Sequence, residues 1–336
     1  MNRTARLASL LSLASALTGC ALAAPEVGDE RVGSADQAFE LQSSYRVLGF
    51  LVEALGIGLN GTALNGAVLD GHSVVHASLL GVKKGAAAVD QVSIDGTELL
   101  GRLADGKHIR GKAFEGTRFP AVLEDGTTIP VTLDAVERSN AQADRDVWRV
   151  HVSYDTQIGP QPLCGLDADG APVAAIPLAG RPDTNLGTPG GGGWVHDAST
   201  VTFACEGHVL AKCVELGYKP WRQGKVCQPK GGCQTVSLAA HHEACTRMLR
   251  ADFCGDGASH TVDGVTIGMS DAFGIRVDAT AWPFEAEWTA AGARCAARPR
   301  VAGLPLPACW ASLADPTCGD ASHFQSGTLI MTEGLP

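Results

Sequence analysis

Histidines and carboxylates gather in one short stretch of the second half of the chain. His241 and His242 are adjacent, and Asp252, Asp256 and His260 follow closely. Imidazole and carboxylate groups are ligand types for zinc, and carboxylates can serve as general acids and bases. These five residues are therefore the candidate catalytic residues of an extracytoplasmic, metal-dependent hydrolase.

The spacing of the two histidines argues against that chemistry. The segment lacks the His-Glu-x-x-His pattern, which places two imidazoles on one helical face. Adjacent residues on a helix point about 100° apart, so His241 and His242 could not easily share a metal. The alternative is structural: one imidazole buried and hydrogen-bonded, the other at a cap or in water, and Asp252 holding a helix end or turn. We expect no metal and no cofactor.

Other chemical signatures are weak or absent. Asp256-Gly257 and Asp263-Gly264 could belong to a calcium loop, but their spacing is not that of an EF-hand and turns explain them equally well. No serine occupies a Gly-x-Ser-x-Gly elbow. The stretch from Gly187 to Gly193 lacks the Lys-Ser/Thr ending of a phosphate-binding loop, so we predict a flexible loop there.

The eleven cysteines divide into one and ten. Cys20 stands alone, and the others lie in the second half. Because no Cys-x-x-Cys occurs, disulfides are favoured over zinc, and disulfides persist outside the reducing cytosol. The connectivity is not readable, although Cys227–Cys233 and Cys309–Cys318 would close short loops. The predicted disulfide cysteines are Cys164, Cys205, Cys213, Cys227, Cys233, Cys245, Cys254, Cys295, Cys309 and Cys318.

The first twenty residues have the build of a secretory signal. Arg3 and Arg6 precede an uncharged run from Leu7 to Leu17 that is too short to span a bilayer. Leu17-Thr18-Gly19-Cys20 resembles the lipobox of bacterial lipoproteins, which implies lipid on Cys20 and membrane anchoring. The alternative is Ala21-Leu22-Ala23, where an ordinary signal peptidase would release a secreted protein.

Composition limits the kinds of partner that the protein is expected to bind. Residues 21–43 are poor in large apolar side chains and are predicted to form a flexible tether. The formal net charge is −10, which excludes a nucleic-acid-binding surface of the usual basic kind. The expected partners are the membrane, through Cys20, and an unidentified envelope protein or glycan. Trp282, Trp288 and Trp310 could line a sugar-binding face, but tryptophans of a disulfide-rich fold are more often core.

Apolar residues recur at every fifth position early in the folded part. They are Leu59, Leu64, Leu69, Val74 and Leu79. The period fits neither a helix nor a plain strand, and it resembles pentapeptide repeats, which form square coils. Five units make little more than one coil, so short strands linked by Asn-Gly and Asp-Gly turns are an equal alternative.

The remaining elements are conventional. Residues 121–123 and 129–133 flank the Asp125-Gly126 turn and predict a β-hairpin, and alternation over 147–154 predicts a half-buried strand. Helices are expected within 205–217 and over 236–250. The domains predicted from this pattern are a β-rich region at 44–158 and a disulfide-rich region at 159–336.

The second half resembles the bacterial ADYC-domain family. The naming tetrapeptide is Ala251-Asp252-Phe253-Cys254, with Phe in place of Tyr. The resemblance covers roughly residues 160–325 and implies an exported, cysteine-rich protein of unknown activity, with no catalytic residues to carry over. The segments that also match are Lys212-Cys213, Gly217-Tyr218-Lys219-Pro220-Trp221, His242 with Ala244-Cys245, Glu285-Ala286-Glu287-Trp288, Gly292-Ala293-Arg294-Cys295 and Cys318-Gly319.

The sequence thus predicts an α+β fold that is mainly β. Two functions of different class follow from it. The first is a structural or ligand-binding module of the cell envelope, and the second is the hydrolase centred on residues 241–263. The absence of an enzyme signature favours the module.

Overall fold

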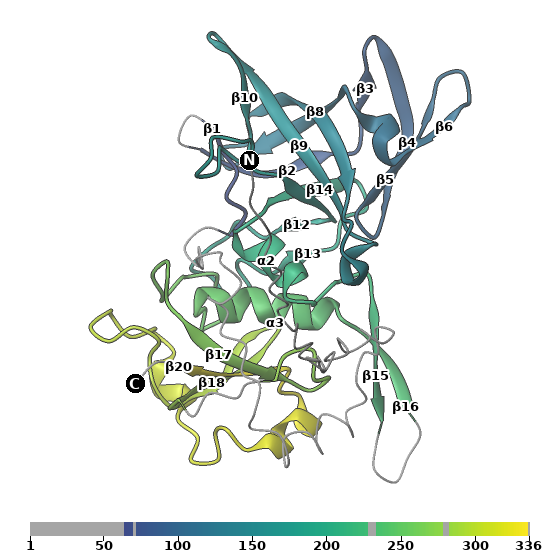
Figure 1. The fold of residues 1–336 in the computed structure, drawn as a ribbon. Helices are drawn as coiled ribbons and strands as arrows, with labels where there is room; N and C mark the ends of the chain where they lie inside the picture. The colour runs from purple at the N-terminus through teal and green to yellow at the C-terminus, as the bar shows by residue number, and fades with distance from the viewer. Residues whose placement is uncertain (1–63, 70–71, 228–232, 278–281, 335–336) are drawn as a thin grey trace, which may run out of the picture. The chain divides into compact units, whose positions relative to one another are not determined.

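The computed structural model describes residues 64–69, 72–227, 233–277 and 282–334 (Figure 1). Strands dominate these residues, with two α-helices and several short 3₁₀ turns among them. The predicted α+β, mainly β class is therefore confirmed. The signal, Cys20, the tether and Leu59 lie outside the described residues.

Six antiparallel strands close on one another as a barrel. In barrel order they are β2 (His72–Ser78), β14 (Thr200–Cys205), β11 (Ala175–Ala179), β9 (Trp148–Thr156), β8 (Thr128–Arg138) and β7 (Thr117–Leu123), and β7 pairs back to β2. Closure satisfies the backbone groups that an open sheet would leave at its edges. The predicted hairpin appears as β7 and β8, and the predicted half-buried strand as β9.

Large side chains fill the barrel. Phe119 is completely buried, and its ring meets those of Phe114 and Phe203 at centroid distances of 6.4 and 5.6 Å. Val131, Leu133 and other aliphatic residues of the same cluster occupy the remaining interior. A small barrel is normally filled in this way, so a ligand would have to sit at a mouth and not in the lumen.

Further strands extend the barrel. β10 (Gly159–Pro162) pairs with β9, and β1 (Val68–Leu69) pairs with β2. On the other side β3 (Lys83–Lys84) leads from β7 to β4 (Ala87–Asp95), β5 (Glu98–Leu103) and β6 (His108–Arg110). Three of the barrel-sheet strands, β10, β11 and β14, follow residue 158, so the sheet continues beyond the predicted β-rich region.

The five-residue period does not mark a square coil. Leu69 and Val74 lie on the antiparallel strands β1 and β2, and Leu79 follows β2 directly. All three are buried in the barrel core. The pentapeptide-like coil is thus wrong for the described residues between 64 and 79, which form short antiparallel strands, whereas the Asp70-Gly71 turn predicted to link them lies outside the described residues.

Two helices form the centre of the second half. α2 (Val209–Glu215) and α3 (Ala239–Arg250) fall within the two predicted helical segments. α3 ends at Ala251, which adopts a left-handed conformation with φ 51°. That conformation lets the amide N–H groups beyond the helix return to its last carbonyls.

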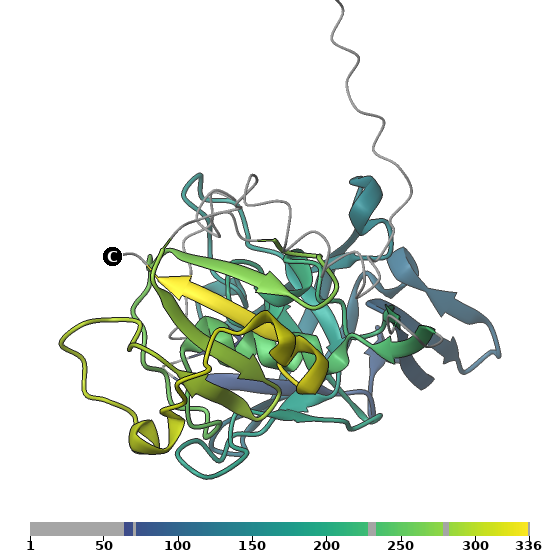
Figure 2. The ribbon, with the colours of Figure 1, turned by 90° about the horizontal axis from the view of Figure 1, so that it is seen from below.

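A four-stranded sheet packs with these helices. Its order is β17 (Ile267–Asp271), β20 (Ile330–Gly334), β18 (Phe284–Thr289) and β19 (Gly292–Ala296), and Figure 2 shows β20 between β17 and β18. The minor elements are β12 (Arg181–Pro182), β13 (Trp194–Val195), β15 (Gln223–Cys227), β16 (Cys233–Ser237), η2 (Gly111–Phe114), η3 (Gln142–Asp144), η4 (Trp310–Leu313) and η5 (Ala321–Ser326).

Disulfides cross-link the second half. Each of the nine predicted cysteines whose side chains the structure describes is disulfide-bonded. The predicted local pair Cys309–Cys318 is wrong, because both residues bond to partners from other elements. Cys233 is disulfide-bonded, and it lies opposite Cys227 in the β15–β16 ladder, but the side chain of Cys227 is outside the described set. The four pairs that the structure describes are Cys164–Cys205, Cys213–Cys245, Cys254–Cys309 and Cys295–Cys318.

A partly buried polar cluster links the loop before β9 to the chain after α2. Asp146 accepts hydrogen bonds from Lys219, Trp221 and Arg222 at 2.9, 2.7 and 2.7 Å. Although burial alone raises it, these donors bring the pKa of Asp146 well below its ordinary value. The segment from Lys219 to Arg222 therefore holds the barrel loop through hydrogen bonds to the carboxylate of Asp146.

Candidate functional site

The two adjacent histidines point to different neighbours. His242 Nε2 lies 3.1 Å from the carbonyl oxygen of Leu210 in α2, to which it donates. The His241 ring packs instead between those of Tyr218 and Phe273, at centroid distances of 6.2 and 4.6 Å. The expected divergence is therefore present, but both rings are buried, so neither faces water. Neither nitrogen of His241 has a hydrogen-bond partner among the described residues.

Burial keeps both histidines neutral. Desolvation lowers the pKa of each from 6.5 to about 4. In the unfolded chain each histidine titrates near the ordinary pKa of 6.5. Between pH 6.5 and pH 4 the unfolded chain therefore binds more protons than the folded chain does. Each histidine therefore makes the free energy of unfolding fall as the pH falls from about 6.5 toward 4.

We expect His242→Gln to remove one such contribution. Glutamine can donate to the Leu210 carbonyl but does not titrate, so the variant should lose less stability on acidification than the wild type. For a shift of this size the difference is up to about 3 kcal/mol between pH 7 and pH 4. Urea unfolding at both pH values measures it. Glu215 acts with the opposite sign, because burial raises its pKa to about 7, so slopes must be compared between proteins.

The control is His108→Gln, which changes an exposed histidine on β6. Its pH dependence should match that of the wild type. Equal slopes for His242→Gln and the wild type would contradict the buried neutral state.

Asp252 is committed to a buried ion pair. It is completely buried, and its Oδ2 accepts from Arg247 of α3 and, at 2.8 Å, from the backbone N–H of Gly257. Its Oδ1 accepts from the N–H of Asp256 at 3.0 Å. These partners use the carboxylate to shape the turn that follows α3, which is the structural role predicted as the alternative.

Arg247 carries the same connection into the glycine-rich loop. Its guanidinium donates to the carbonyl oxygens of Gly190 and Gly191, and the N–H of Gly190 donates to Gly255 O at 2.8 Å. The N–H of Gly187 donates to Asp256 O at 2.7 Å. The loop predicted to be flexible is thus hydrogen-bonded to the segment after α3, and glycine permits the close approach of the two backbones.

The remaining candidates also have local roles. Asp256 Oδ1 accepts from the N–H of Ala258 at 2.9 Å, which closes a turn and explains its position without a cation. The N–H of His260 donates to Arg250 O, and its ring lies 6.4 Å from that of Phe253. Among the described residues, each of the five predicted catalytic side chains therefore contacts different neighbours.

The tetrapeptide 251–254 is a structural junction. Ala251 ends α3, Asp252 pairs with Arg247, and Cys254 bonds to Cys309. Phe253 is buried, with its ring centroid 5.1 Å from that of Trp288 and 5.3 Å from that of Trp310. The apolar surroundings suit phenylalanine and leave the two tryptophans in or against the core.

Two buried glutamates of β18, which the sequence marked only as part of the family resemblance, form ion pairs in the structure. Glu285 forms a two-pronged ion pair with Arg300, at 2.9 and 3.0 Å. Arg300 also donates to the carbonyls of Met248 and Leu249 at the end of α3. The Glu-x-Glu spacing with arginines downstream was the available signal, since residues two apart on a strand share a face.

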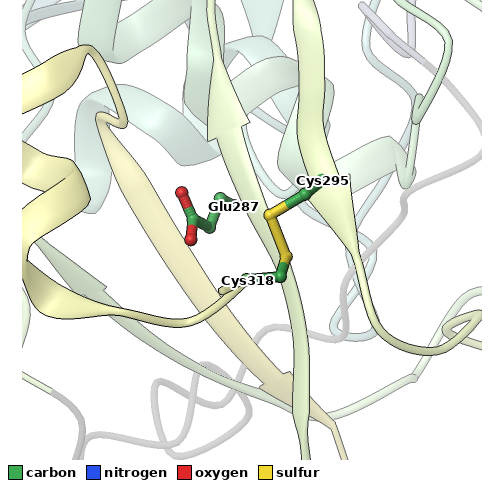
Figure 3. Close-up of side chains that lie close together, drawn as sticks. All are labelled: Glu287, Cys295 and Cys318. Atoms are coloured by element: carbon green, nitrogen blue, oxygen red, sulfur yellow. A yellow bond between two sulfur atoms is a disulfide. The ribbon is translucent and has the colours of Figure 1, made fainter. Parts of the chain in front are cut away.

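Glu287 holds the segment near the end of the chain. Its Oε1 lies 2.7 Å from both the N–H of Gly319 and Nδ1 of His323, and its Oε2 accepts from Thr328. Figure 3 shows its carboxylate beside the Cys295–Cys318 disulfide. This is the one group of potential metal ligands among the described residues, but its sulfurs are bonded to each other and offer no thiolate.

A hollow of about 720 Å³ opens at one mouth of the barrel. A smaller one of about 350 Å³ adjoins it, and Tyr154 and Gln161 line both. Tyr154 of β9 is the register partner of Gln161 on β10, so the two side chains lie on one face. The other lining residues are Gly66, Val68, Leu69, Ile129, Pro130, Asp155, Thr156, Gln157, Ile158, Pro162, Leu163, Cys164, Gly165 and Leu166.

Apolar side chains surround this hollow at the surface. Ile158, at the tip of the β9–β10 hairpin, is 87% exposed, Leu166 is 60% exposed and Val68 is 50% exposed. Exposed apolar groups around a concave surface are typical of binding sites, and barrel mouths are frequent positions for them. The sequence analysis missed this site because its residues come from β1, β8, β9 and β10, which only the barrel brings together.

Among the described residues, no helix is long and apolar enough to cross a membrane. The disulfides indicate folding in an oxidising, extracytoplasmic compartment.

Comparison with known proteins identifies the family. A family model described as the ADYC domain matches residues 111–302, which is more than half of the chain. The match begins within the β-rich region, earlier than the tetrapeptide and its neighbours indicated, and it ends before Cys318. No curated protein and no solved structure matches the chain. The chain belongs to the ADYC domain family.

Proposed function

We propose that this protein is a ligand-binding module of the cell envelope and that its binding surface is the hollow around Tyr154. The observation that carries the proposal is the hollow itself, which combines a partly buried aromatic ring, amide side chains and exposed apolar groups. The filled barrel interior supports a site at the mouth.

The buried polar residues support binding over catalysis. The carboxylate oxygens of three buried acids are hydrogen-bonded to partners within the protein, namely in Asp252, Glu285 and Glu287. The side chains of His241 and His242 are buried. A general acid or base must reach the proton that it transfers, and these groups have no such access. Their enclosure favours the binding module over the hydrolase.

The proposed location is the membrane surface outside the cytoplasm. The oxidised cysteines support export, and the Leu17-Thr18-Gly19-Cys20 sequence supports a lipid anchor on Cys20. Mass spectrometry of the membrane fraction tests the anchor. A mature chain that begins at Ala24 without lipid would replace it with secretion.

We expect Tyr154→Ala to weaken ligand binding at least tenfold, because it removes the ring that both hollows share. Ligand-induced shifts in melting temperature, measured over panels of oligosaccharides, peptides and lipids, provide the assay. Leu304→Ala, which truncates an exposed side chain far along the chain, is the control. Ligands that stabilise the wild type and Tyr154→Ala equally would place the binding surface elsewhere.

A further inference from the structure

The strand β10 presents an edge without N–H donors. The N–H of Leu163 donates to Val152 of β9 at 2.7 Å, so strand alternation directs the N–H groups of residues 161 and 159 toward β9 as well. The outward positions are 160 and 162, and both are proline. A peptide partner therefore cannot extend the sheet here, because it would find no donors on this edge.

The charges around the hollow are few. Among its described lining residues there is no lysine, arginine or histidine, and Asp155 is the one acid. Asp155 has Arg118 3.9 Å away, with both side chains largely exposed. A phosphate, nucleotide or acidic polysaccharide would find no cation lining the hollow, and a cationic ligand would find a single, partly compensated carboxylate.

The uncharged polar side chains that line the hollow suit a neutral ligand that forms hydrogen bonds. Gln161 Nε2 donates to Pro160 O at 3.0 Å, which orients the amide and leaves Oε1 to accept. The Thr156 hydroxyl donates to Gly159 O at 2.6 Å and accepts from the N–H of Ile158 at 3.3 Å, so it retains one acceptor position. No described residue bonds the Tyr154 hydroxyl. The surface thus offers an aromatic ring flanked by fixed amide and hydroxyl groups.

We infer that the hollow around Tyr154 binds a neutral oligosaccharide, with a sugar ring packed against the tyrosine and its hydroxyls bonded to Gln161 and its neighbours. This inference rests on the proposed function and adds the ligand class. A pyranose has an apolar C–H face that packs on an aromatic ring, and rim hydroxyls that both donate and accept. The hollow opens to the surface, which suits a chain of sugars that enters and leaves there. Exposed Ile158 and Leu166 extend the apolar contact beyond one ring.

The test uses neutral hexasaccharides as probes, namely chitohexaose, cellohexaose, laminarihexaose and maltohexaose. Saturation-transfer NMR and calorimetry with the exported chain should show binding by at least one of them. We expect Tyr154→Phe to retain affinity within about threefold and Tyr154→Ala to lose at least tenfold. Gln161→Ala should lose about five- to tenfold, the value of one hydrogen bond. Affinity should change less than twofold between 50 and 500 mM salt, because no counterions are released.

The outcomes separate the two proposals. If a peptide or a heparin fragment binds in a Tyr154-dependent way and no neutral hexasaccharide does, the sugar inference is overturned and the proposed function survives. A steep loss of affinity with salt likewise overturns the inference. If neutral sugars bind but Tyr154→Ala and Leu304→Ala behave alike, the site is wrong and both proposals fail. Absence of binding by every probe at millimolar concentration also overturns the inference.

Discussion

Asp252→Ala should lower the free energy of unfolding by about 3–5 kcal/mol. The substitution leaves the Arg247 guanidinium buried without its carboxylate, since only 2% of that residue is exposed. It also leaves the N–H of Gly257 without its acceptor. Breaking one side of a buried pair costs far more than the pair contributes by itself, because the surviving charge cannot return to water. Equilibrium unfolding in urea measures the loss.

A second measurement distinguishes this mechanism from general destabilisation. Arg247 connects Asp252 to the glycine-rich loop, so the variant should exchange amide hydrogens faster at Gly187 and Gly190 before it unfolds globally. Asp90→Ala, at an exposed position on β4, is the matched control and should change stability by less than about 0.5 kcal/mol. A loss below 1 kcal/mol for Asp252→Ala would refute the assigned role.

Removal of the disulfide between the two helices should cost roughly 3–4 kcal/mol. Cys213 of α2 and Cys245 of α3 are both completely buried, and their sequence separation is 32 residues. The cross-link limits the unfolded chain over that loop, and its loss restores the entropy. The double variant Cys213→Ala/Cys245→Ala tests this by thermal and urea unfolding.

The control compares the double variant with the wild type after full reduction. If the cross-link is responsible, the gap in stability should shrink to the small packing cost of two missing sulfur atoms. A gap that persists under reduction would assign the effect to a cavity between α2 and α3 instead.

The sequence predicted the features that depend on local pattern. The β7–β8 hairpin follows from the two apolar segments around Asp125-Gly126, and α3 follows from the apolar stripe of residues 236–250. The divergence of His241 and His242 followed from helical geometry alone. Oxidised cysteines followed from number and spacing, without their pairing.

The remaining features depend on contacts between distant segments. Cys254 and Cys309 are 55 residues apart, so a short-loop rule chose Cys318 as the partner instead. The barrel requires β2 to pair with β14, and no local sequence pattern predicts that pairing. The hollow around Tyr154 could not be predicted for the same reason, since its lining residues come together only when the barrel forms. The five-residue period failed because its buried members belong to different elements, Leu69 to β1 and Val74 to β2, with Leu79 directly after β2.

The pairing of β2 with β14 also sets an order of events during folding. Ser78 pairs with Thr200, so the barrel cannot close until the chain as far as β14 is available. Until then one edge of β2 is unpaired. Folds built on contacts between distant segments form slowly, and unpaired strand edges make their intermediates prone to aggregation. Cys164 emerges before its partner Cys205, which terminates β14. Correct oxidation of the Cys164 thiol therefore has to wait for Cys205, so a catalyst of disulfide exchange should raise the yield of native protein.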